Sequence, residues 1–212
     1  LSDADTHIFS DELNHASIVD GCRLSRAETF IYDHNDLEHL AWGLRQARGR
    51  ASLIVTDSVF SMDGDVAPLD GIVELAKNHD VRVMVDEAHA TGTVGPGGRG
   101  AVAALELTSE VDVIVGTLGK ALGSYGAYAA CDTQMARYLV NTSRSFIYST
   151  APAPPVAAAV AEALPQNPGE DAVRAVRASV WGVPDDALGG LPLGAAFAAF
   201  TRRGTARMRA RA

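Results

Sequence analysis

Three short apolar runs at nearly even spacing constrain the fold of this chain more than any other feature. They occupy residues 52–56, 81–85 and 111–115, and their first residues are 29 and 30 positions apart. Each run is β-branched and apolar almost throughout, which is typical of a strand buried on both faces of a parallel sheet. Parallel neighbours need a crossover of a dozen or more residues, and this spacing leaves room for a helix in each connection.

Helical periodicity appears before, between and after these runs. The buried stripe of one helix comprises Leu37, Leu40, Ala41 and Leu44. The stripe of a second, which begins after Pro68, comprises Leu69, Ile72, Val73 and Ala76. We expect Asn35 to be the N-cap of the first, with Glu38 at capping-box spacing. Asp132 is expected to cap a third helix, whose inward residues are Met135, Tyr138 and Leu139.

Alternating strands and helices predict an α/β fold with an open, mostly parallel sheet. A closed (β/α) barrel is the alternative, but the irregular loops at 57–68 and 86–100 favour the open sheet. Residues 1–165 are predicted to form the core domain. Residues 166–212 are rich in Ala, Gly and Arg with weak periodicity, and we expect the remnant of a small second domain or a disordered tail.

Composition narrows the functional classes. The net charge of −8 argues against a nucleic-acid-binding surface. No apolar run approaches the roughly 20 residues needed to span a bilayer, so no membrane partner is expected. The sequence holds two cysteines, Cys22 and Cys131, which cannot form a disulfide framework. We therefore expect a cytoplasmic protein with reduced thiols.

Polar side chains follow each apolar run, where open α/β sheets bind their ligands. Asp57 follows the first, Asp86 and His89 the second, and Thr117 and Lys120 the third. We expect these groups to converge on one edge of the sheet. Four other histidines show no metal-ligand spacing, and we expect them at the surface or at helix ends. They are His7, His34, His39 and His79. No metal site is predicted.

These residue types match the requirements of pyridoxal 5′-phosphate (PLP). The cofactor needs a lysine amine for a Schiff base, a carboxylate for its ring nitrogen and hydroxyl or N–H groups for its phosphate. Lys120, Asp86, Ser61, Thr117 and His15 can supply these parts. An alternative comes from residues 86–89, which spell the DEAH box of helicase-type NTPases. That class requires a G-x-x-x-x-G-K-[ST] loop, and the only candidate, GTLGKA at 116–121, has the wrong spacing.

Five strings resemble the α-oxoamine synthase family of fold-type I PLP enzymes, in the family's order and spacing. They are DELNHAS (11–17), TDSVFSMDGDVAPL (56–69), VDEAHATG (85–92), GRG (98–100) and GTLGKALG (116–123). FIYSTAPAPP (146–155) is similar to the family's next segment, so the resemblance covers about residues 10–165. It implies the major domain of that fold. Members of the family are longer, and we expect their N-terminal part and C-terminal small domain to be largely missing here.

The resemblance implies roles for individual residues. Lys120 would form the Schiff base and later remove the Cα proton of the substrate. Asp86 would pair with the pyridinium nitrogen, His89 with the ring oxygen, and His15 would stack on the ring and assist decarboxylation. The other residues that the resemblance places at the cofactor are Asp57, Ser61, Thr117, Ser149 and Thr150. The last two would reach the phosphate of a partner subunit, because the family's site lies at a homodimer interface.

The implied reaction is a decarboxylating condensation of an amino acid, alanine in the favoured case, with an acyl thioester such as pimeloyl-CoA. Acetyl transfer to glycine is the alternative within the family. A third possibility is an inactive remnant, because the small-domain arginine for the substrate carboxylate falls at Phe197 in a weak alignment of residues 204–209. Ser145 also replaces a proline that is usual after Arg144.

Overall fold

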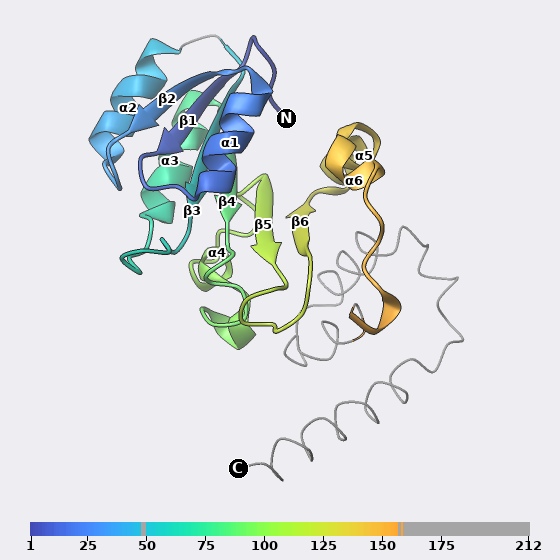
Figure 1. The fold of residues 1–212 in the computed structure, drawn as a ribbon. Coiled ribbons are helices and arrows are strands. Elements are labelled where there is room, and N and C mark those ends of the chain that lie inside the picture. The colour runs from blue at the N-terminus through green and yellow to red at the C-terminus, as the bar shows by residue number, and fades with distance from the viewer. Residues whose placement is uncertain (48–49, 157, 159–212) are drawn as a thin grey trace.

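The computed structural model describes residues 1–47, 50–156 and 158 of the 212-residue chain (Figure 1). The strands are β1 (His7–Asp11), β2 (Glu28–Tyr32), β3 (Ser52–Asp57), β4 (Arg82–Asp86), β5 (Val113–Thr117) and β6 (Ala127–Cys131). The helices are α1 (Ala16–Ser25), α2 (Leu37–Gln46), α3 (Leu69–His79), α4 (Ala101–Ala104), α5 (Thr133–Thr142) and α6 (Arg144–Ile147), with a 3₁₀ turn at Pro96–Gly98.

The strands form one open sheet in the order β2-β1-β3-β4-β5-β6. β1 to β5 pair in parallel, and β6 pairs antiparallel with β5. The predicted α/β class with an open, mostly parallel sheet is confirmed. The barrel alternative is wrong, because β2 and β6 form two separate edges of this sheet.

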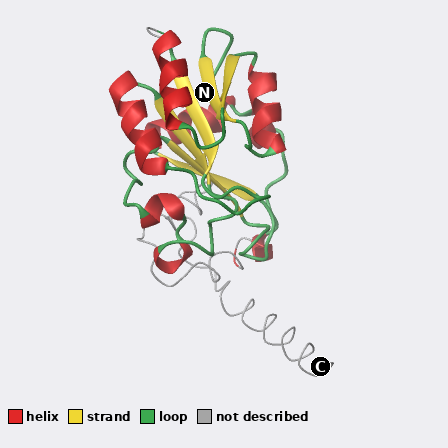
Figure 2. Ribbon diagram, turned by 90° about the vertical axis from the view of Figure 1, so that its left-hand side faces the viewer, coloured by secondary structure: helices red, strands yellow, loops and turns green. Residues whose placement is uncertain are grey.

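Helices lie on both faces of the sheet (Figure 2), and an apolar cluster of buried side chains lies on each face. On one face, Phe9, Ile54 and Val85 pack with the buried residues of α2 and α3. On the other face, Leu53 and Val55 pack with Ile18 and Cys22 of α1. Because side chains alternate along a strand, the odd-numbered positions of β3 point to α1 and the even-numbered positions to α2 and α3.

The predicted helices form, with one correction at a cap and one at a buried face. The predicted stripe of α3 is buried, and Leu40 and Leu44 are buried in α2. The N-cap of α2 is Asp36, whose carboxylate accepts from the N–H groups of Glu38 and His39. Asn35, the predicted cap, has a left-handed φ of 57° instead, and its N–H donates to Asp11.

Asp132 caps α5 as predicted, by accepting from the N–H of Met135 at 2.7 Å. The expectation that Tyr138 faces inward is wrong, because it is 52% exposed and no residue of α5 is fully buried. α5 therefore lacks the buried stripe that normally anchors a surface helix.

The strand predictions from the apolar runs are right in kind and displaced at their ends. β3 and β4 each extend one residue beyond the expected end, to Asp57 and Asp86, and β5 begins two residues later than expected. The sequence did not predict β1, β2 and β6.

The domain boundary at residue 165 and everything expected of residues 166–212, Phe197 included, lie outside the described residues. Within the described part, no helix is both long and apolar enough to cross a bilayer.

Candidate active site

The carboxyl edge of the sheet brings three predicted site residues to one face. Asp57, Asp86 and Thr117 are the last residues of β3, β4 and β5. The register pairs Asp57 with Asp86 and Asp86 with Val115, and Thr117 lies two residues beyond Val115 on the same side. All three therefore lie on the α1 face of the sheet, at the edge where ligands bind in folds of this kind.

Asp57 and Asp86 form a close pair of acids at this edge. The Asp57 side chain is buried, and its Oδ2 accepts from the N–H of His15 at 2.8 Å. Burial raises the pKa of Asp57 to about 6; the His15 N–H opposes this and the charge of Asp86 adds to it. Oδ1 of Asp86 accepts from the N–H of Ala88 at 2.8 Å, and no hydrogen bond to Oδ2 occurs within the described residues.

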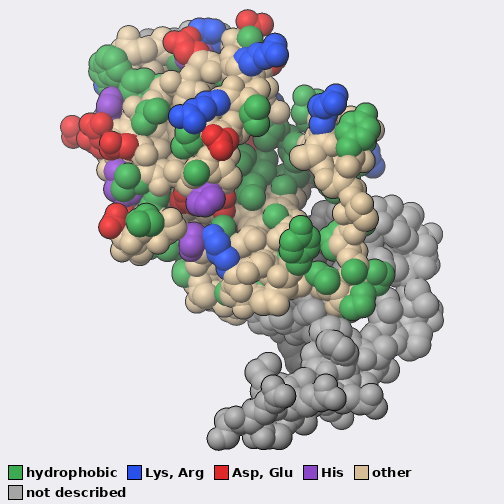
Figure 3. Space-filling model, in the orientation of Figure 1, with side chains coloured by type: hydrophobic (Ala, Val, Ile, Leu, Met, Phe, Trp, Pro, Cys, Tyr) green, Lys and Arg blue, Asp and Glu red, His purple; other side chains and the backbone are tan. Residues whose placement is uncertain are grey.

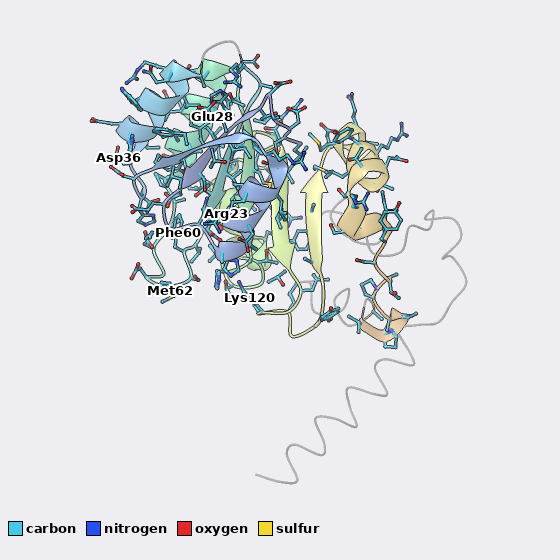
Figure 4. The ribbon with its side chains drawn as sticks, turned by 45° about the horizontal axis from the view of Figure 1, so that its top comes forward. Arg23, Glu28, Asp36, Phe60, Met62 and Lys120 are labelled. Atoms are coloured by element: carbon cyan, nitrogen blue, oxygen red, sulfur yellow. The ribbon has the colours of Figure 1, made fainter. Side chains whose placement is uncertain are left out.

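Lys120 meets His89 beside these acids. Its Nζ lies 2.7 Å from Nε2 of His89, across 31 residues of sequence. Burial, and next the charge of Lys120, lower the pKa of His89. The neutral ring then accepts at Nε2 from the lysine ammonium. Figure 4 shows Lys120 at the same end of the sheet as Phe60 and Met62, away from Glu28 at the start of β2.

His15 stands at the start of α1, on the same face of the sheet. It is the N-cap of that helix, and its Nδ1 accepts from the N–H of Ser17 at 3.2 Å. The ring is exposed. The backbone N–H of His15 donates to Oδ2 of Asp57, so His15 lies beside the acid pair.

Thr117 holds the turn that leads to Lys120. Its Oγ1 accepts from the N–H of Gly119 at 3.2 Å and donates to the carbonyl of Gly126 at 3.3 Å. Gly116, the residue before Thr117, is glycine for a steric reason. A Cβ there would collide with the ring of Tyr128, its partner in β6.

The structure brings together Asp57, Asp86, His89, Thr117, Lys120 and His15. It does not connect the other three predicted residues to them by any hydrogen bond in the described chain. Ser61 is exposed in the loop after β3. Ser149 and Thr150 are exposed beyond α6, and the hydroxyl of Ser149 donates to the carbonyl of Ser145.

The DEAH string has a structural explanation that differs from metal binding. Strand alternation sends Asp86 to the site and Glu87 to the opposite face, where it is 1% exposed. Its two oxygens accept from the N–H groups of Ala101 and Val102 at 2.9 and 2.7 Å. Both oxygens of Glu87 are therefore used to hold the start of α4, on the face away from Asp86. No group of three or more metal-ligating side chains occurs within the described part.

Sequence reasoning missed two groups near the site. Glu87 had no signal of its own inside the motif. His34 was expected at the surface, yet it lies between Asp11 and Asp65, which are 23 and 31 residues away. The one available hint was that each of these acids stands near the end of a strand or in the loop after one.

Figure 3 shows one face of the molecule with its side chains coloured by type. Histidine side chains and a basic side chain gather there beside acidic ones (Figure 3). Apolar side chains line the hollow between this body and the part that carries α5 and α6.

Comparisons with known proteins agree with this site. The family model for aminotransferase class I and II matches residues 1–180. The 8-amino-7-oxononanoate synthase of Anaeromyxobacter dehalogenans (strain 2CP-C) is 52% identical over 160 residues, which are 76% of this chain and 40% of that protein. The 8-amino-7-oxononanoate synthase of Geobacter sulfurreducens is 51% identical over 158 residues, again 40% of its length. The chain thus spans about 40% of the curated relatives it matches.

Solved structures give the same result. The serine palmitoyltransferase of Sphingomonas wittichii superposes with a TM-score of 0.72 at 31% identity, over 85% of this chain and 43% of that one. The 8-amino-7-oxononanoate synthase of Francisella tularensis superposes with a TM-score of 0.62 at 34% identity, over 72% of this chain and 44% of that one. A further serine palmitoyltransferase structure, with a TM-score of 0.71 and 33% identity over 86% and 43% of the two chains, contains PLP as an internal aldimine.

The fold is that of the fold-type I PLP domain, and the chain belongs to the aminotransferase class I and II family. Within that family its similarity is to the α-oxoamine synthases, as the motifs predicted.

The residues present fit PLP, the cofactor of this family. The exposed amine of Lys120 lies against an imidazole, as a covalent anchor beside a hydrogen-bonding group would require. Asp86 offers a carboxylate oxygen with no hydrogen bond from the described residues, on the same face of the sheet. A protonated ring nitrogen of the cofactor would donate a hydrogen bond to that oxygen, and its positive charge would reduce the repulsion between Asp86 and Asp57.

Proposed function

We propose that this chain carries the cofactor site of an 8-amino-7-oxononanoate synthase. The reaction joins the Cα of L-alanine to the acyl carbon of pimeloyl-CoA, and releases CoA and CO₂, in biotin biosynthesis. Identities of 52% and 51% to the 8-amino-7-oxononanoate synthases of A. dehalogenans and G. sulfurreducens support this choice of substrates. The observation that carries the chemistry is the contact of Lys120 with His89 on the face that holds Asp57 and Asp86.

Each residue of the site has a role in this proposal. PLP, when bound, supplies an electron sink for the charge that develops at the substrate Cα. Lys120 anchors the cofactor and then accepts the Cα proton at Nζ. Asp86 keeps the ring nitrogen protonated, and Asp57 beside it adds negative charge. His89 holds the ring oxygen.

The remaining residues bind and orient. His15, at the start of α1, covers one face of the ring and assists the loss of CO₂. Thr117 and Ser61 bind the cofactor or its phosphate. Ser149 and Thr150 are exposed beyond α6 and reach the phosphate in a second copy of the chain, so the proposed unit is a homodimer in the cytoplasm.

The sequence makes the anchor test unusually clean, because it contains only two lysines, Lys77 and Lys120. Lys77 lies on α3 and pairs with Glu110 at 2.8 Å. We expect the wild-type chain and Lys77→Ala to form a yellow, borohydride-reducible adduct with PLP, and Lys120→Ala to form none. Mass mapping after reduction should place the adduct on the peptide that contains Lys120. An adduct that persists in Lys120→Ala and disappears in Lys77→Ala would refute the assignment.

Release of the CoA thiol separates the proposed activity from its alternatives. Wild-type chain loaded with PLP should release thiol when alanine and pimeloyl-CoA are both added. Thiol release with glycine and acetyl-CoA alone would indicate the other member of the family. An adduct at Lys120 without thiol release from either pair would identify an inactive remnant that still binds the cofactor.

A further inference from the structure

A histidine that the proposed function does not use lies next to the site. His34 follows β2, and its Nδ1 is 2.8 Å from Oδ1 of Asp11 while its Nε2 is 2.6 Å from Oδ2 of Asp65. Ionised carboxylates can only accept, so both ring nitrogens donate. The ring is therefore an imidazolium held between two negative charges.

The surroundings favour this charged form. Burial by itself lowers the pKa of His34, but the hydrogen bonds to Asp11 and Asp65 and their charges outweigh it, and the net result is a raised pKa. The edge of the ring packs on Phe60, with 4.4 Å between ring centroids. Asp11 comes from β1 and Asp65 from the loop after β3. From β2, Tyr32 stays neutral, because burial raises the pKa of its phenol.

Other charged groups of the same loop face elsewhere. Asp33 pairs with His39 at 3.1 Å, and Asp36 caps α2. The charge of His34 is therefore balanced by Asp11 and Asp65.

Asp11 connects His34 to the turn that carries His15. Its Oδ1 also accepts from the N–H of Leu13 at 2.9 Å, which shapes residues 11–15. The next residue, Asn14, donates to the carbonyl of Val55 and accepts from the N–H of Asp57, each at 2.8 Å. The His15 turn, as we name residues 11–15, thus runs from the imidazolium to the acid pair of the site.

Asp65 connects His34 to the loop that carries Ser61. The carbonyl of Asp65 accepts from the N–H of Phe60 at 3.0 Å, which closes residues 60–65 into a compact unit, the Ser61 loop. Asn35 adds a second tie, because its side-chain amide donates to Oδ2 of Asp65 at 2.8 Å. Four of the six residues of this loop are exposed, so few other contacts fix it to the body.

We propose that His34 is a positioning residue: its imidazolium joins the His15 turn to the Ser61 loop and so sets one side of the active site. The inference deepens the proposed function, since it gives His15 and Ser61 a common support. His34 itself touches neither Lys120 nor the acid pair, and it acts through Asp11 and Asp65.

Amide hydrogen exchange of the 212-residue chain without PLP tests this directly. His34→Gln keeps a polar side chain of similar size but carries no charge and can donate to only one of the two acids. The matched control is His79→Gln, because His79 ends α3 at the opposite edge of the sheet. Near pH 6 we expect His34→Gln to exchange about tenfold faster in both the His15 turn and the Ser61 loop. β4 and α3 should be unchanged, and His79→Gln should match the wild type in both segments.

The dependence on pH separates a charge-based support from simple packing. Because the pKa of His34 is raised, its contribution is complete below the ordinary histidine value of about 6.5 and is lost at higher pH. The ratio of the amide exchange rate in His34→Gln to that in the wild type should therefore fall from about ten near pH 6 toward one at about pH 9. A ratio that stays constant, or equal exchange at pH 6, would overturn the proposal.

Asp65→Asn provides a second route to the same answer if His34→Gln unfolds. It keeps an acceptor for His34 but removes one charge, so faster exchange should be confined to the Ser61 loop. Acceleration throughout the sheet would instead mean a general loss of stability and would contradict a positioning role. Because the measurement uses no cofactor, failure of Lys120 to bind PLP would leave this result standing.

Discussion

Single residues at the carboxyl edge of the sheet derive their properties from neighbours far away in the sequence. Asp57 is the clearest case, because a buried acid in register with Asp86 holds its proton far more readily than an acid in water. The structure compensates with one N–H group from His15, and Lys120 contributes a smaller opposing charge. Such an arrangement favours an additional positive group between α1 and the strand ends.

The raised pKa of Asp57 gives a prediction for stability against pH. In the folded state the acid binds its proton up to about pH 6, compared with an ordinary value of 3.8, so ionisation opposes folding as the pH rises. The full cost above pH 6 is about 3 kcal/mol. In urea unfolding, the difference in the free energy of unfolding between Asp57→Asn and the wild type should shift in favour of the variant by about this amount from pH 4 to pH 7. Asp63→Asn, at an exposed loop position, should show no comparable gain. A parallel pH dependence for Asp57→Asn and the wild type would contradict the assigned burial effect.

Helices and strands differ in how far their positions can be predicted from local sequence. The run at 52–56 and the stripe of α3 were predictable, because burial on two faces or one stripe leaves a strong apolar pattern. β2 is an edge strand with a largely exposed pattern, and β6 is rich in alanine, so neither carries that pattern. Cap choice at α2 failed because Asn35 is recruited by Asp11, a contact made across 24 residues.

Residues of the candidate site also differ in whether the sequence could predict them. Lys120, Asp86 and His89 were found because the chain returns to one sheet edge about every 30 residues, and their motifs lie at those returns. His34 and Glu87 were not found, because their partners come from other elements and leave no periodic trace. Their roles depend on the assembled fold.

The loop between β4 and α4 provides a prediction at the scale of elements. Gly100 has φ of 100° and ψ of 174°, a region almost restricted to glycine, and a Cβ there would meet the carboxylate of Glu87. Gly100→Ala should therefore lower the free energy of unfolding by about 2–4 kcal/mol, from strain and from displacement of a buried acid. Gly21, inside α1 with open space around it, is the matched control. Gly21→Ala should raise stability by up to about 1 kcal/mol. Equal effects of the two substitutions in thermal or urea unfolding would show that Glu87 does not constrain this loop.

In the described part of the chain, the segment from the β5–β6 turn to α6 exposes several large apolar side chains. Exposed apolar residues from the β5–β6 turn to the end of α6 are Tyr125, Tyr138, Val140, Phe146, Ile147 and Tyr148. α5 and α6 contribute no fully buried residue. Exposed apolar patches of this kind mark surfaces that associate with another molecule. A second copy of the chain is the occupant that the proposed function requires.

Self-association is therefore the prediction that belongs to the whole molecule. Sedimentation equilibrium should give the mass of two chains at micromolar concentration and above. Ile147→Asp introduces a charge into a side chain that is 44% exposed in the single chain, so folding should be preserved while the dissociation constant of the dimer rises about tenfold or more. Leu24→Asp is the matched control, because Leu24 is 83% exposed on α1, outside this surface, and should leave the dimer intact. A chain that remains monomeric throughout, or a dimer weakened equally by both substitutions, would exclude the exposed apolar surface between Tyr125 and Tyr148 as the interface. In that case Ser149 and Thr150 would lose their proposed role at the phosphate of a partner.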